Sequence, residues 1–150
     1  RIQIEKQVLV PSIKRVVEKF REETNIHILL QCECQNPDIP ANMEMNAYRI
    51  VQESLTNIRK HAEAHTVRVM LSCSSGGTYC LLVEDDGVGF EDAAKRGRPG
   101  EHIGLSIMEE RARRLGGNLR IESEVGEGTR VELTYQPKLD RRGLERRWIM

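Results

Sequence analysis

Apolar residues recur along the chain with two different periods, and these periods predict its helices and strands. Spacing of three and four residues, typical of helices with one buried face, predicts helices at residues 10–24, 41–62 and 105–115. Alternation of apolar and polar residues predicts strands at residues 26–34, 65–73, 79–84, 118–123 and 129–136.

Each predicted strand has one apolar face, so helices are expected to cover only one side of the sheet. The turn sequence SSGGT at 74–78 predicts a hairpin, and therefore antiparallel pairing of the two strands beside it. The fold class is thus α/β (α+β), a two-layer α/β sandwich. We expect one domain at 10–137, the end of an upstream linker or helix at 1–9, and a basic tail at 138–150.

The charges balance, with 23 Lys and Arg residues against 23 Asp and Glu residues. This argues against nucleic-acid binding, which needs a net basic surface, so any phosphate ligand must be held locally. No apolar run has the length of a membrane span and no signal peptide opens the chain. We expect a cytoplasmic domain without direct membrane contact. Because it begins at Arg1 and not at methionine, we expect it to be part of a larger protein.

The chain has four cysteines, at positions 32, 34, 73 and 80. Cys32 and Cys34 continue the apolar alternation of their strand, which places them on its buried face. A metal site is the alternative, but no C-x-x-C or spaced histidine pair accompanies them. We therefore expect reduced core cysteines, as in a reducing cytoplasm.

The helix predicted at 41–62 carries a polar face. At 100° per residue, one stripe of its surface holds Glu53, Asn57, Lys60 and His61. A carboxylate, a carboxamide, an ammonium and an imidazole suit a metal–phosphate ligand. A solvated helix face of mixed charge is the alternative explanation of the same pattern.

Three glycine clusters lie at the junctions between predicted elements. Glycine is needed where the backbone takes positive φ or approaches a ligand closely. One such cluster indicates only a turn, whereas three of them together with a polar helix face indicate a nucleotide site. The familiar phosphate loops G-x-x-x-x-G-K-[ST] and G-x-G-x-x-G do not occur. The clusters are Gly87 and Gly89, Gly100 and Gly104, and Gly126 and Gly128.

Four motifs occur in the order found in a known ATP-binding family. The helix motif E-x-x-x-N-x-x-K-H resembles the N box of the Bergerat-fold domain shared by histidine kinases, DNA gyrase and MutL. The sequence DDGVGF at 85–90 resembles the D-x-G-x-G box of that family. HIGLSIMEERARRLGG at 102–117 resembles its second glycine box with the following helix, and GEGT at 126–129 its third. The resemblance implies a mixed, mostly antiparallel sheet.

The residues within and around these motifs are similar to those of one branch of that family. QESLTNIRKHA, the phenylalanine after GVG, and GLSIMEERARRLGG resemble sensor histidine kinases of the nitrate/nitrite-sensor branch. In that branch the ATP-binding domain follows a dimeric helical hairpin that carries the phosphorylated histidine. The chain is therefore expected to be the ATP-binding catalytic domain alone.

The resemblance assigns the base side of the site to four residues. It implies that Asp85 accepts a hydrogen bond from the adenine amino group, with Thr129 adding a hydroxyl contact. Gly87 and Gly89 are implied to let the backbone pass close to the base. A turn-capping aspartate is the alternative role for Asp85.

The resemblance assigns the phosphate side mainly to the polar helix face. It implies that Asn57 binds Mg²⁺, with Glu53 as a second metal or catalytic residue. Glu53 activates water in hydrolysing relatives, and in a kinase it positions Mg²⁺-bound water instead. Lys60 and His61 are implied to hold phosphate oxygens, although His61 could also simply offset the helix dipole.

The second glycine box is implied to complete the phosphate side. Gly104 starts a helix whose amides face the phosphates, and Leu105 follows it. His102 occupies a position where the family often has glycine, and it could itself reach a phosphate. Residues 91–103 are implied to form a lid over ATP, with Lys95, Arg96 and Arg98 as possible phosphate contacts.

None of the four histidines lies in a helical acidic–His context, so the phosphoacceptor is expected on another domain. The implied function is to bind Mg²⁺–ATP and transfer its γ-phosphoryl group to a histidine of the dimerisation domain of the same parent protein. A response regulator is the implied downstream partner. The alternatives are a serine/threonine kinase of the anti-sigma type and a regulatory module that only binds ATP.

Overall fold

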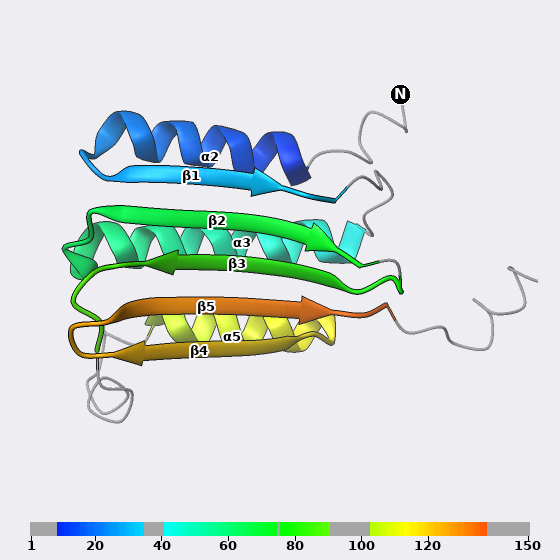
Figure 1. The fold of residues 1–150 in the computed structure, drawn as a ribbon. Coiled ribbons are helices and arrows are strands. Elements are labelled where there is room, and N and C mark those ends of the chain that lie inside the picture. Colours follow the sequence, from blue (N-terminus) through cyan, green and yellow to red (C-terminus); the bar gives the residue numbers. More distant parts are fainter. Residues whose placement is uncertain (1–8, 35–40, 75, 91–102, 138–150) are drawn as a thin grey trace, which may run out of the picture.

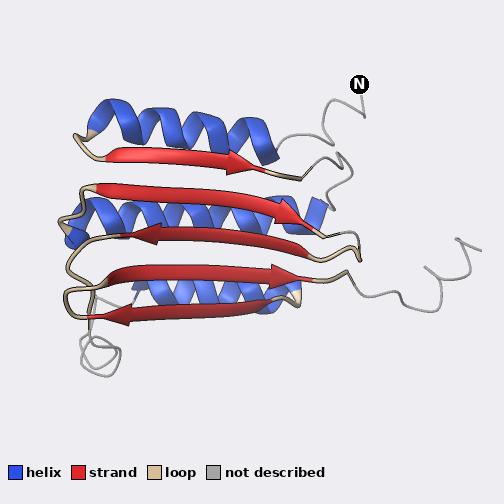
Figure 2. Ribbon diagram, in the orientation of Figure 1, coloured by secondary structure: helices blue, strands red, loops and turns tan. Residues whose placement is uncertain are grey.

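The computed structural model describes residues 9–34, 41–74, 76–90 and 103–137. Within these ranges, three α-helices lie on one face of a five-stranded sheet (Figures 1 and 2). The helices are α2 (Leu9–Glu23), α3 (Ala41–Asn57) and α5 (Ile103–Leu115), and a π-helical turn, η1 (Ile58–Ala62), follows α3 directly. The strands are β1 (His27–Cys32), β2 (Thr66–Cys73), β3 (Tyr79–Asp85), β4 (Asn118–Glu124) and β5 (Gly128–Tyr135).

The strands lie in the order β1-β2-β3-β5-β4. β1 and β2 pair in parallel, because α3 returns the chain to the end of the sheet where β1 began, and the other three pairs are antiparallel. The predicted two-layer sandwich and the mixed, mostly antiparallel sheet are both confirmed. The register aligns Asp85 with Thr129, and Thr129 with Ser123, in one row across β3, β5 and β4.

The core lies between the helices and the sheet. Alternate residues of β2 and β3 point into it, and the apolar stripes of the helices cover them, as the two sequence periods predict. The largest fully buried side chains of this core come from all three helices and four of the strands: Leu9, Ile13, Ile28, Met43, Ile50, Leu71, Leu81, Met108 and Leu133.

The expectation of reduced cysteines holds for Cys32 and Cys80, which are free, and was wrong for Cys34 and Cys73. Cys32 is exposed, not buried as expected, and Cys34 forms a disulfide with Cys73. The parallel register pairs Cys32 with Leu71 and so brings the residue two positions later beside Cys73, with 5.0 Å between the two Cα atoms. Cys80 lies half-buried on the outer face of β3, beside Glu132. The apolar alternation predicted which residues share a face of each strand, but it did not predict the register of β1 against β2, which brings Cys34 and Cys73 together.

The predicted continuous α-helix at 41–62 needs a correction at its end. The α-helix ends at Asn57, and residues 58–62 form one π turn. A π turn holds more residues than an α turn, so the angle of 100° per residue no longer applies to Lys60 and His61. Glu63 then ends the helix with φ of 50°.

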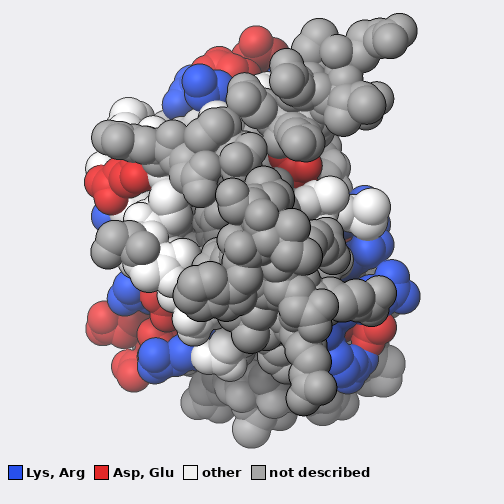
Figure 3. All heavy atoms as spheres, turned by 90° about the vertical axis from the view of Figure 1, so that its right-hand side faces the viewer, with Lys and Arg blue, Asp and Glu red and all other residues white. Residues whose placement is uncertain are grey.

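Charged side chains of both signs are mixed over the described surface. Figure 3 shows basic and acidic side chains close together around one side of the molecule. Several form exposed ion pairs, such as Arg114–Glu110 at 3.1 Å and Arg120–Glu122 at 2.9 Å, which contribute little to stability. No helix in the described ranges has the length and apolar character needed to cross a membrane.

Candidate functional site

Residues from three separate sequence motifs line one small cavity at the end of the sheet. Its volume is about 90 Å³, whereas a site that encloses a whole drug-sized ligand has roughly 300 Å³ or more. The cavity therefore suits one part of a ligand, such as an aromatic ring. Its lining residues are Asn57, Ile58, His61, Asp85, Val88, Gly89, Phe90 and Thr129.

Asp85 is the buried acidic group of this cavity. It is the last residue of β3 and is only 8% exposed. Burial raises the pKa of its carboxyl group, while a hydrogen bond from the backbone N–H of Gly87, at 2.7 Å, opposes that rise. This bond also fixes the orientation of the carboxyl group. Asp85 thus offers a fixed hydrogen-bond acceptor to a ligand in the cavity.

Two glycines allow backbones to meet at the wall of the cavity. Gly89 has φ of +67°, and a Cβ atom there would lie 2.0 Å from the carbonyl oxygen of Glu124. Gly128 has φ of +86°, and a Cβ atom there would lie 2.1 Å from the carbonyl oxygen of Asp85. No other residue type fits either position. The motif DDGVGF and the turn between β4 and β5 are therefore packed directly against each other.

Ser123 ties the same two segments together through its hydroxyl group. Its Oγ accepts a hydrogen bond from the backbone N–H of Phe90 at 2.9 Å and donates one to the carbonyl oxygen of Gly128 at 3.0 Å. It also lies 2.8 Å from the hydroxyl oxygen of Thr129. Sequence reasoning missed this residue. The sequence feature that could have identified it is its position: Ser123 is a polar residue on the same inward face of the strand as Leu119 and Ile121.

Asp86 joins the start of β2 to the end of β3. Its Oδ1 accepts hydrogen bonds from the backbone N–H groups of His65, at 2.8 Å, and Thr66, at 2.9 Å. The bonds from Thr66 and His65 lower the pKa of this carboxyl group. Asp86 therefore fixes the start of β2 relative to Asp85. Sequence reasoning missed this residue too, although the doublet of aspartates at a strand end marked the position.

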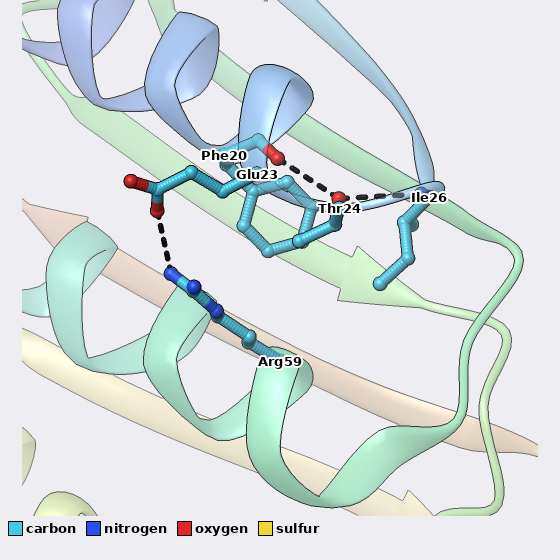
Figure 4. A network of polar contacts seen from close by, with 5 residues as sticks. All are labelled: Phe20, Glu23, Thr24, Ile26 and Arg59. Carbon is cyan, nitrogen blue, oxygen red and sulfur yellow. Dashed lines mark hydrogen bonds and ion pairs between the residues drawn. The ribbon is translucent and has the colours of Figure 1, made fainter.

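An ion pair holds the π turn against α2 (Figure 4). Arg59 of the turn forms an ion pair of 2.6 Å with Glu23, the last residue of α2. Thr24 caps that helix end, because its hydroxyl group donates to the carbonyl oxygen of Phe20 at 2.8 Å and accepts from the N–H of Ile26 at 3.2 Å. The π turn is thus joined to the end of α2.

The structure does not bring the four residues of the predicted polar face together in one cavity. Asn57, half-buried, and His61, exposed, line the cavity that contains Asp85. Glu53 instead lines a cavity of about 390 Å³ between α2 and α3, and Lys60 is exposed and lines neither. Among the described residues, none of these four side chains has a hydrogen-bond or ion-pair partner.

The second glycine box is only partly described. Gly104 lies in the first turn of α5, and Leu105 is buried in the hydrophobic core at 8% exposed. Of the lid predicted at 91–103, residues 91–102 lie outside the described residues, with Lys95, Arg96, Arg98 and His102, and Ile103 is the first residue of α5. Gly87 is buried beneath the turn that follows β3.

The described residues could supply only a small part of the ligands of a magnesium ion. No group of three or more His, Cys, Asp or Glu side chains is close enough to hold a metal in the described ranges. The side chain of Asn57 is half-buried beside the cavity and supplies a neutral oxygen. Mg²⁺ bound with a nucleotide takes one or two protein ligands, with the others from phosphates and water, so this donor set fits that kind of site.

Comparisons with known proteins agree with this geometry. Residues 42–139 match the family described as "Histidine kinase-, DNA gyrase B-, and HSP90-like ATPase". The "Sensor protein NarQ homolog" of Haemophilus influenzae is 31% identical over 134 residues, which cover 89% of this chain and 23% of that protein. "Sensor histidine kinase ComP" of Bacillus subtilis is 37% identical over 128 residues, which cover 85% of this chain and 16% of that protein.

The fold is also found among solved structures. Full-length ShkA, solved in complex with AMPPNP, superimposes with a TM-score of 0.68 at 23% identity, over 85% of this chain and 29% of that one. The chain spans less than a quarter of the two curated relatives named above. The predicted resemblance to nitrate/nitrite-sensor kinases is confirmed. The chain belongs to the histidine kinase-, DNA gyrase B- and HSP90-like ATPase family, and within it resembles the ATP-binding domains of NarQ-type sensor histidine kinases.

Proposed function

We propose that the chain binds Mg²⁺–ATP and transfers the γ-phosphoryl group to a histidine on a separate dimerisation domain of the same parent protein. A nitrogen of that imidazole forms a bond to the γ-phosphorus, the bond to the bridging oxygen breaks, and ADP leaves. A response regulator receives the phosphoryl group afterwards. The observation that carries this proposal is that Asp85 and Asn57, from two separate motifs, line the same cavity.

The cavity is the base end of the proposed site. Asp85 accepts a hydrogen bond from the adenine amino group, and Thr129 adds its hydroxyl group beside it. The aromatic side chain of Phe90 and the close backbone at Gly89 form walls for a flat ring. The AMPPNP bound by ShkA supports an adenine nucleotide as the ligand.

The phosphate end of the proposed site begins at Asn57. Its carboxamide oxygen is a ligand for Mg²⁺, the ion that neutralises phosphate charge when it is bound. Lys60 and His61, one turn further along, supply positive charge and a hydrogen bond for phosphate oxygens. Gly104, in the first turn of α5, places backbone amides at the helix end that favours anions. Positioning and charge neutralisation supply the catalysis.

Phosphoryl transfer tests this proposal most directly. The chain is incubated with Mg²⁺, ATP labelled on its γ-phosphate, and the dimerisation domain of the parent protein. The expected product is labelled dimerisation domain whose label is lost in acid and kept in alkali, as phosphohistidine is. Acid-stable label on a serine of an added protein would instead identify a serine kinase. Tight ATP binding without any labelled protein would identify a regulatory module.

A further inference from the structure

The row of side chains that crosses β3, β5 and β4 contains more than the adenine-binding residues. Asp85, Thr129 and Ser123 are register partners on these three neighbouring strands. Asp85 and Thr129 line the small cavity, which Ser123 does not line, and all three residues line a neighbouring cavity of about 610 Å³. Ser123 nevertheless touches the hydroxyl group of Thr129, with 2.8 Å between the two oxygens. Through this contact it can act on a ligand in the small cavity.

The hydrogen-bonding capacity of Ser123 determines which oxygen donates. A serine hydroxyl group has one proton and two lone pairs. The carbonyl oxygen of Gly128, at 3.0 Å, can only accept, so it takes the proton of Ser123. The backbone N–H of Phe90, at 2.9 Å, can only donate, so it takes one lone pair. One lone pair remains, and the contact with Thr129 is a hydrogen bond only if Thr129 donates.

The hydroxyl proton of Thr129 is therefore donated to the oxygen of Ser123. What its hydroxyl group presents to the cavity is lone pairs, so it acts there as an acceptor. The carboxylate of Asp85, on the neighbouring strand, is also an acceptor. Two acceptors side by side match an amino group on the edge of a base. A base with a carbonyl oxygen at that edge would find no hydrogen-bond donor there, and its oxygen would be repelled by the two acceptor oxygens.

We infer that Ser123 is a positioning residue for base selection, because it fixes the hydroxyl group of Thr129 as an acceptor and so favours 6-aminopurines over 6-oxopurines. This inference rests on the proposed binding of ATP. It assigns Ser123 no contact with the nucleotide. Removal of the Ser123 hydroxyl group frees the Thr129 proton, and Thr129 can then rotate to donate to a carbonyl oxygen.

The test compares two triphosphates that differ at the 6-position of the base. ATP carries an amino group there and inosine triphosphate carries a carbonyl oxygen, while the ribose and phosphates are the same. Calorimetric titration of each, with Mg²⁺ present, gives the ratio of the dissociation constant of inosine triphosphate to that of ATP. In Ser123→Ala this ratio is expected to fall about 3- to 10-fold, the loss of roughly one neutral hydrogen bond.

A double-mutant cycle separates this role from a structural one. Thr129→Val removes the hydroxyl group itself and is expected to lower the ratio about as much as Ser123→Ala. Adding Ser123→Ala to Thr129→Val is expected to change the ratio no further. A general loosening of the site would weaken the binding of both nucleotides in either background. Ser72→Ala, on the same sheet but away from the cavity, is the matched control.

Ser123→Cys carries the same test if Ser123→Ala does not fold, because a thiol fills the space but hydrogen-bonds weakly. A wild-type chain that selects ATP while its serine variants keep the full ratio would overturn the role of Ser123 and leave the proposed function standing. An equal effect of Ser123→Ala with and without Thr129 would do the same. A wild-type chain that binds neither nucleotide would overturn both proposals.

Discussion

The base end and the phosphate end of the proposed site are built in different ways. At the base end, Asp85 and Ser123 are held by backbone hydrogen bonds, and glycines let two segments touch. At the phosphate end, the side chains of Asn57 and His61 border the cavity without a partner among the described residues. One end has its hydrogen bonds made within the protein, whereas the other presents side chains that have no partner among the described residues.

The difference follows from what each end binds. A neutral base is recognised by a few hydrogen bonds of fixed direction, so the groups that make them gain from being held in place. A metal–triphosphate brings its own charge and most of its own ligands, so the protein has to supply only a few donors. Changes at the base end are therefore expected to affect folding and recognition together. Changes at the phosphate end are expected to affect binding alone.

The largest effect is expected from Gly89→Ala. The new Cβ atom meets the carbonyl oxygen of Glu124 and also needs positive φ, so the variant is expected to lose more than about 2 kcal/mol of unfolding free energy. Gly126→Ala is the control, since Gly126 has φ of +86° but open space around it. It is expected to lose only about 1 kcal/mol. Urea denaturation measures both, and equal losses would contradict the close packing described at Gly89.

Asn57→Asp is expected to remove binding without loss of stability. The change puts a negative charge beside the phosphates and removes a neutral metal ligand, so Mg²⁺-dependent affinity for ATP is expected to fall at least about tenfold. The unfolding free energy is expected to change by less than about 0.5 kcal/mol, because the side chain bonds no other described residue. Titration with ATP and urea denaturation measure the two quantities. Full Mg²⁺-dependent binding in this variant would remove Asn57 from the site.

Asp86→Ala tests the link between the start of β2 and the end of β3, beside the base end. It removes the acceptor for two backbone N–H groups and is expected to cost about 1 kcal/mol of unfolding free energy, because the exposed position limits the loss. Asp86→Asn keeps an oxygen acceptor and is expected to restore most of the stability. Thermal denaturation of the two variants compares them. Equal destabilisation by Ala and Asn would show that charge, and not the two hydrogen bonds, is what matters.

The two aspartates are expected to respond to acid in opposite ways. The pKa of Asp86 is lowered in the folded state, so its contribution to stability is present at neutral pH and is lost as pH falls through that lowered pKa. The pKa of Asp85 is raised by burial, so the cost of its charge is relieved as pH falls. Stability curves of Asp86→Asn and Asp85→Asn against pH check both signs. An unchanged pH dependence in both would contradict them.

Protonation of Asp85 is also expected to weaken nucleotide binding. In the proposed site the carboxylate is the acceptor for the base, and its raised pKa means that it is lost at a higher pH than an ordinary aspartate would be. ATP affinity measured at decreasing pH is therefore expected to fall earlier in the wild-type chain than in Asp85→Asn, whose acceptor does not titrate. The same curve for both proteins would assign the pH dependence to another group.

Most of the fold could be predicted because its signals are local. The two apolar periods placed the helices and strands within a few residues, and one apolar face on each strand required a single layer of helices. The disulfide of Cys34 with Cys73 could not be predicted, since it depends on the register of a parallel pair far apart in sequence. The π turn was missed for a related reason, because packing and not the apolar period decides where an α-helix widens.

The candidate site could be predicted only as a set of motifs. Asp85, Asn57 and Thr129 were named from the sequence, but only the fold brings them to one cavity. Ser123 and Asp86 were missed because their roles are hydrogen bonds to the backbone of distant residues. Glu53 shared the helical stripe of Asn57 in sequence, yet it lines the groove between α2 and α3.

The most direct test of the two-ended site is titration of the wild-type chain and Asp85→Ala with ATP, each in the presence and absence of Mg²⁺. Asp85→Ala is expected to lose at least about tenfold in affinity in both conditions, because the base end acts without the metal. The wild-type chain is expected to bind more tightly with Mg²⁺ than without it. Binding of ATP by Asp85→Ala as tight as that of the wild-type chain would contradict the assignment of this cavity to adenine.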